Sequence, residues 1–79
     1  MGVKKVIYPN LIAELSRNGI TYTSLAKALG ISRAAMYKKL DGVTNFTLKD
    51  ITTIQEVINA NSNGGYTLDY LFYRSEKTA

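Results

Sequence analysis

One local pattern occurs four times in this chain and limits it to a helical fold. In each copy an apolar residue precedes Ser or Thr, and a second apolar residue follows five positions after the first. A helix that begins there has a free N–H group capped by the hydroxyl, while the two apolar residues pack together. The pattern therefore predicts four helix starts: Ile20-Thr21…Leu25, Ile31-Ser32…Met36, Phe46-Thr47…Ile51 and Tyr66-Thr67…Leu71.

A fifth helix start is expected at Pro9, because proline suits the first position of a helix. Apolar spacing then predicts helices over residues 9–18, 22–29, 33–40, 48–60 and 68–73, with Gly19, Gly30 and Gly42 as stops. No useful stretch alternates with the period of a strand, so we expect an all-α fold. The expected core is Leu11, Ile12, Leu15, Leu25, Ala26, Leu29, Ile31, Met36, Leu40, Leu48, Ile51, Ile54, Val57, Ile58, Leu68, Leu71 and Phe72.

The domain limits follow from the same pattern. We expect an extended arm over residues 1–8, one folded domain over residues 9–74 and a frayed tail over residues 75–79. No apolar run reaches the roughly 18 residues of a membrane span, and the first residues lack the long apolar stretch of a secretory signal. We therefore expect a cytoplasmic protein.

Composition argues against an enzyme. The 79 residues include no Cys and no His, so neither a disulfide nor a thiolate metal site can hold the fold together. The chain has no GxGxxG motif, no P-loop and no carboxylate pair placed for acid–base work. We expect no enzymatic activity, no cofactor and no small-molecule ligand.

The positive charge is concentrated in the middle of the chain. The net charge is +4, and the whole excess lies within residues 21–49. Such a localised basic field is typical of a protein that binds a polyanion. The cations of this segment, opposed by Asp41 alone, are Lys27, Arg33, Lys38, Lys39 and Lys49.

Residues 25–36 carry the most specific motif. Two helices can cross steeply over a short turn when Gly30 takes a positive φ and Ala26 permits close approach. Here the chain resembles the Cro/CI-like, or XRE-type, helix-turn-helix domains of phage repressors and Gram-positive bacterial regulators. The similarity covers about residues 8–72. It implies a compact five-helix lambda-repressor-like domain with its motif at about 21–42, in a bacterial cell or a phage-infected host.

The resemblance implies that the helix over about 33–41 lies in the major groove of DNA. If Met36 and Leu40 face the core, Ala34 and Lys38 point directly away from it at about 100° per residue. Arginine and lysine can donate to guanine O6 and N7, while Tyr or Ala can contact thymine methyl groups. The expected base-reading residues are Ser32, Arg33, Ala34, Tyr37 and Lys38.

The resemblance also implies phosphate contacts at the first turn of the preceding helix and in the loop after the reading helix. The candidates are Tyr22, Thr23, Ser24, Lys39, Thr44 and Asn45, with Lys4 and Lys5 on the arm. Two registers remain open for Lys39. If Met36 and Leu40 set the core, its ammonium is free to reach a phosphate. If the usual family register holds, Lys39 occupies an apolar position and must extend its charge outward.

The sequence thus predicts a sequence-specific, double-stranded DNA-binding transcriptional regulator of the phage repressor or Cro type. A dimer on half-sites roughly 34 Å apart would supply enough base contacts. The expected dimer surface is the end of the fourth predicted helix with the loop and helix that follow, which carry Tyr66, Tyr70, Phe72 and Tyr73. Two alternatives stay open: these residues belong to the core, or the dimer forms only on DNA. The alternative is a helix-turn-helix protein-interaction module, such as an antitoxin or antirepressor. Binding to a membrane is not expected, because the basic helix offers only Met36 and Leu40 as apolar contacts.

Overall fold

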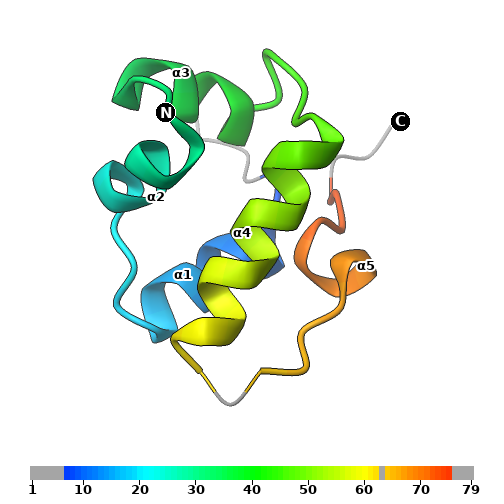
Figure 1. Cartoon of the computed structure of the whole chain (residues 1–79). Helices are drawn as coiled ribbons and strands as arrows, with labels where there is room; N and C mark the ends of the chain where they lie inside the picture. The colour runs from blue at the N-terminus through cyan, green and yellow to red at the C-terminus, as the bar shows by residue number, and fades with distance from the viewer. Residues whose placement is uncertain (1–6, 63, 76–79) are drawn as a thin grey trace, which may run out of the picture.

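The computed structural model describes residues 7–62 and 64–75, which form five helices and no strand. They are α1 (Pro9–Arg17), α2 (Tyr22–Leu29), α3 (Arg33–Leu40), α4 (Leu48–Ala60) and α5 (Leu68–Leu71). In Figure 1, α4 runs through the middle of the molecule, with α2 and α3 together at one end and α5 on the other side. The all-α, five-helix prediction is confirmed, although α5 ends at Leu71 rather than at Tyr73.

All four predicted hydroxyl caps are present. Each hydroxyl accepts a hydrogen bond from the N–H three residues later, at 3.0 Å for Thr21, 3.0 Å for Ser32, 3.1 Å for Thr47 and 3.2 Å for Thr67. At α4 the cap is reciprocal, because the Thr47 N–H donates to the Asp50 carboxylate at 3.0 Å. These caps fix where four of the five helices begin.

The core lies against α4. Ile54 and Ile58 are fully buried, together with Leu11, Leu15, Leu25, Met36 and Leu71. The prediction for Leu48 is wrong, because its side chain is 75% exposed. Leu48 lies six residues before Ile54. At about 100° per residue, this spacing puts the Leu48 side chain about 120° around the helix from that of Ile54. It therefore leaves the buried face at the first turn.

The residues just before α1 belong to the domain rather than to an arm. Ile7 and Tyr8 are 9% and 5% exposed. The Tyr8 ring packs edge-on against Phe46 at 5.3 Å and Phe72 at 6.1 Å between centroids. Residues 1–6 of the expected arm, which include Lys4 and Lys5, lie outside the described residues.

The last described residues close over Ile7 and Tyr8. The Ser75 N–H donates to the Ile7 carbonyl at 3.0 Å, and the Arg74 guanidinium donates to the Tyr8 hydroxyl at 2.9 Å. Ser75, expected in the tail, is therefore bonded to the domain, and residues 76–79 lie outside the described residues. These two hydrogen bonds hold the first and last described residues together, so each end of the domain stabilises the other.

A buried carboxylate joins α1 to α5. Glu14 is 1% exposed, and its Oε2 accepts hydrogen bonds from the Tyr70 hydroxyl at 2.8 Å and from Arg17 at 2.9 Å. The Tyr66 side chain lowers the pKa of Glu14 most, although Oε1 forms no well-aligned hydrogen bond. Burial alone would raise the pKa of Glu14. The hydrogen bonds of Tyr66 and Tyr70 and the charge of Arg17 together outweigh burial, so the pKa is lowered. The charged form of Glu14 therefore stabilises the fold.

We expect Glu14→Gln to lower Tm at pH 7 by roughly 5 °C, because a charge-assisted bond becomes a neutral one. The folded-state pKa lies below the ordinary value of 4.5, so this stabilisation is complete above pH 4.5 and is lost as the pH falls through the folded pKa. Thermal unfolding of both proteins from pH 7 to pH 3 checks this. A gap in Tm that does not shrink in acid would contradict it.

Candidate nucleic-acid interface

The turn between α2 and α3 has the predicted geometry. Gly30 has φ +73°, and its N–H donates to the Lys27 carbonyl at 3.1 Å. The next N–H, that of Ile31, donates to the Ala26 carbonyl at 3.0 Å. Ala26 is 3% exposed, so the two helices approach closely over its methyl group. The turn therefore reverses the chain within three residues and places α3 across α2.

The rotation of α3 is set by its two buried residues. Met36 is fully buried and Leu40 is 6% exposed, which selects the first of the two registers open from the sequence. Of the residues expected to read bases, Ala34 and Lys38 lie opposite these two at about 100° per residue, whereas Ser32 and Arg33 stand at the start of the helix. All five are exposed: Ser32, Arg33, Ala34, Tyr37 and Lys38. The structure thus brings this predicted set together on one accessible surface.

Tyr37 is supported from the side by Tyr22. Their rings meet edge to face with centroids 5.5 Å apart and an interplanar angle of 83°. Burial raises the pKa of Tyr22, and Tyr37 and Asp41 raise it further, so its hydroxyl remains protonated at neutral pH. The Tyr22 ring therefore packs against Tyr37 while its hydroxyl stays uncharged.

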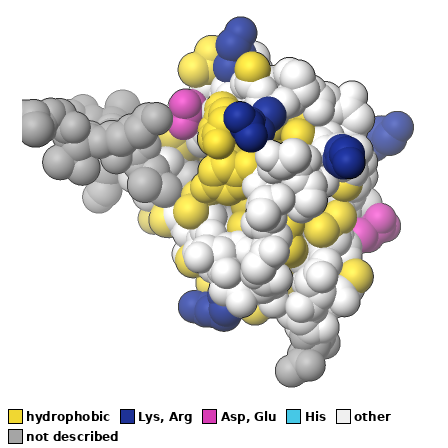
Figure 2. Space-filling model, turned by 90° about the vertical axis from the view of Figure 1, so that its left-hand side faces the viewer, with side chains coloured by type: hydrophobic (Ala, Val, Ile, Leu, Met, Phe, Trp, Pro, Cys, Tyr) yellow, Lys and Arg dark blue, Asp and Glu magenta, His cyan; other side chains and the backbone are white. Residues whose placement is uncertain are grey.

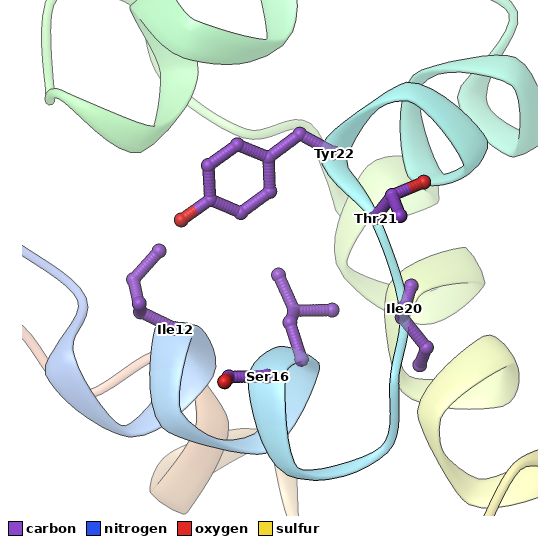
Figure 3. Close-up of a pocket in the computed structure, with 6 residues that line it drawn as sticks. Ile12, Ser16, Ile20, Thr21 and Tyr22 are labelled. Carbon is purple, nitrogen blue, oxygen red and sulfur yellow. The ribbon is translucent and has the colours of Figure 1, made fainter.

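Tyr22 also lines a shallow pocket between α1 and the start of α2. Its hydroxyl points across the pocket toward Ile12, as Figure 3 shows. The pocket has a volume of about 380 Å³ and mainly apolar walls, formed by Ile12, Leu15, Ser16, Ile20, Thr21 and Tyr22.

Lys39 faces inward, in contrast to Lys38. Its ammonium donates to the Asn45 carbonyl at 2.9 Å and forms an ion pair with Asp50 at 3.0 Å. Its side chain is only 14% exposed, so the expectation of a free ammonium is wrong. Sequence reasoning missed this contact because Asp50 lies eleven positions away and reaches α3 only once the loop has folded. Burial alone would raise the pKa of Asp50, but hydrogen bonds from Thr47 and Lys39 lower it overall.

The loop after α3 is held against the end of that helix. The N–H groups of Val43 and Thr44 both donate to the Lys38 carbonyl, at 2.9 and 3.2 Å. Thr44 and Asn45 are exposed, and neither side chain bonds to another described residue. Thr23 and Ser24 are exposed at the start of α2, where Thr23 lies 3.4 Å from the Arg33 guanidinium.

Cations dominate the exposed charge around the turn. Figure 2 shows Lys and Arg side chains spread over the upper part of this side of the molecule, with acidic side chains only near its edges. Among the described residues, none of the exposed cations Lys27, Arg33, Lys38 and Lys49 forms an ion pair with a carboxylate. Their charge is therefore available to a polyanion.

The residues expected at a dimer surface differ in burial. Phe72 packs against the rings of Tyr8 and Phe46, and Tyr66 stacks on Tyr70 at 6.0 Å. Tyr70 and Tyr73 remain 39% and 55% exposed. Two of the four aromatic side chains are thus mainly part of the domain core.

No group of three metal-binding side chains occurs in the described part of the chain. Within that part, no helix has the length and apolar character needed to cross a membrane.

Comparison with known families bears on this surface. A family model described as a Cro/C1-type HTH DNA-binding domain matches residues 10–61. The matched segment runs from α1 to the end of α4 and includes the turn and the exposed face of α3. No curated protein and no solved structure matches the chain significantly.

We expect Gly30→Ala to destabilise the domain by roughly 1–2 kcal/mol, because a Cβ makes the left-handed conformation costly. A Cβ added at Gly30 would meet no neighbouring atom within 4 Å, so the cost is conformational rather than steric. Gly30→Asn should cost less, since asparagine tolerates this conformation. Urea unfolding of the three proteins measures the order, and equal stability of all three would show that the turn does not require glycine.

Proposed function

The chain belongs to the Cro/C1-type helix-turn-helix DNA-binding family, and we propose that it acts as a sequence-specific transcriptional regulator that occupies an operator in double-stranded DNA. The observation that carries the proposal is the exposed face of α3. It presents two cations with no carboxylate partner, Arg33 and Lys38, beside the half-exposed ring of Tyr37. That combination of donors and apolar groups matches the edges of base pairs in the major groove.

The proposed reading of bases depends on the rotation of α3. With Met36 and Leu40 against the core, Arg33 and Lys38 can donate to guanine O6 and N7. Tyr37 and Ala34 offer apolar contacts for thymine methyl groups. The Ser32 hydroxyl already accepts a hydrogen bond from the Ala35 N–H. Its proposed part in DNA binding is therefore mainly to cap the start of α3. Each good base contact discriminates by about 1–3 kcal/mol.

Two groups of residues are proposed to hold the phosphate backbone on either side of α3. At the start of α2, Thr21 bonds the N–H groups of Ser24 and Leu25, which leaves those of Tyr22 and Thr23 for an anion. In the loop, Thr44 and Asn45 offer exposed polar side chains. Lys39 is left out of this contact set, because its ammonium is bonded within the domain.

We propose that two copies bind together. One domain of this size presents few base contacts, and two copies on half-sites roughly 34 Å apart would double them. Tyr70 and Tyr73 are the exposed aromatic residues in and just after α5, and they are the surface through which we expect the copies to meet.

The test of base reading is selection of bound duplexes from a random pool. We expect the wild-type protein to enrich one motif, and Arg33→Ala and Lys38→Ala to relax it at different positions, by about 1–3 kcal/mol each. Lys27→Ala is the matched control, since it removes an exposed cation from α2 outside the proposed contacts. An unchanged motif in both α3 variants would rule out α3 as the reader.

Salt dependence separates DNA binding from the alternative function as a protein-interaction module. We expect affinity for the selected duplex to fall roughly a hundredfold between about 50 and 200 mM salt, as four phosphate contacts would give. Fluorescence anisotropy with a labelled duplex measures this fall in affinity. An affinity that hardly changes with salt and does not differ among sequences would favour a protein partner.

A further inference from the structure

Lys39 occupies an unusual position for a cation on a reading helix. Its side chain is 14% exposed, whereas its neighbour Lys38 is exposed and forms no ion pair with a described residue. The Lys39 ammonium lies 2.9 Å from the Asn45 carbonyl and 3.0 Å from the Asp50 carboxylate. The Phe46 ring lies 5.9 Å away, measured from the ammonium to the ring centroid. One charged group therefore contacts three residues of the following segment.

These contacts join three consecutive elements of the chain. Lys39 belongs to α3, Asn45 to the loop and Asp50 to the first turn of α4. Asp50 is itself held in place, because it accepts from the Thr47 N–H at 3.0 Å while its own N–H donates to the Thr47 hydroxyl at 3.1 Å. The ammonium is thus anchored to the most completely capped helix start in the molecule.

We infer that Lys39 is a positioning residue for DNA recognition, which fixes the loop of residues 42–46 between α3 and α4. The inference rests on the proposed function, in which Thr44 and Asn45 contact phosphates. A loop that is already ordered loses less conformational entropy when its residues bind. Lys39 therefore strengthens binding through the loop, and its own charge is compensated by Asp50 rather than by DNA.

The two adjacent lysines accordingly have different functions. Lys38 is proposed to donate to a base edge, so its loss would change sequence preference. Lys39 displaces no counterion from DNA, because its partner is a carboxylate of the same chain. This property of Lys39 can be measured, since the salt dependence of affinity reports the number of phosphates that protein cations neutralise.

The first arm of the experiment uses the protein without DNA. Amide hydrogen exchange at Val43 and Thr44 is compared in wild type, Lys39→Met, Asp50→Asn and the control Lys38→Met. Asparagine keeps the acceptor for the Thr47 N–H, so Asp50→Asn removes the ion pair and spares the cap. We expect exchange to rise about tenfold or more in Lys39→Met and Asp50→Asn, and to stay unchanged in Lys38→Met. Wild-type protection in Lys39→Met would overturn the inference.

The second arm measures affinity for the selected duplex at several salt concentrations. The temperature is kept below the range in which any variant unfolds. Lys38→Met should weaken binding to the selected duplex and relax its base preference, whereas the loss of a phosphate contact would reduce the slope of log affinity against log salt by about 0.9 per copy. Lys39→Met should keep the slope and weaken binding about five- to tenfold, and adding Asp50→Asn should weaken it little more, because the two residues act as one unit. A slope reduced by about 0.9 per copy in Lys39→Met would identify Lys39 as a phosphate contact. If wild type binds no duplex selectively, the proposed function fails, while the exchange arm still decides whether Lys39 orders the loop.

Discussion

The left-handed turn at Gly30 is the constraint on which the arrangement of the molecule depends. It lets the chain reverse within three residues, and the Ile31 N–H then bonds the Ala26 carbonyl, which brings α3 across α2. At this crossing Met36 and Leu40 are buried together. Their burial leaves the other face of α3 to solvent, and that face carries the proposed contacts to DNA. The geometry of one glycine thus determines which side chains are available.

Two buried or half-buried ionic groups add to what apolar packing provides. Glu14 joins α1 to Tyr70 of α5, and Lys39 joins α3 to Asp50 of α4. In a chain of 79 residues, which can bury only about 60% of its surface, such bonds supply directional contacts where the core is thin. A charge buried without its partner is costly, so each pair also disfavours alternative packings of the helices it joins.

Local features of the fold could be predicted from the sequence, and contacts between distant segments could not. The caps at Thr21, Ser32, Thr47 and Thr67 depend on residues three positions apart, so the helix starts were predictable. The burial of Tyr8 depends on Phe72, and the position of the Lys39 ammonium depends on Asp50. Neither pair has a fixed spacing that a sequence pattern could reveal. For the candidate site, helical periodicity placed the exposed face of α3 correctly, but it could not show that one of the two lysines turns inward.

The edge-to-face contact between Tyr22 and Tyr37 has a consequence for selectivity. A tyrosine on a free surface can swing among rotamers and adapt to several base steps. Here the Tyr22 ring, 5.5 Å away and anchored at the start of another helix, restricts that motion before any DNA is present. In the proposed function Tyr37 is therefore preorganised, and a mismatched base pair would meet a rigid ring rather than an adaptable one. Rigidity of this kind turns a modest contact into a means of rejecting the wrong sequence.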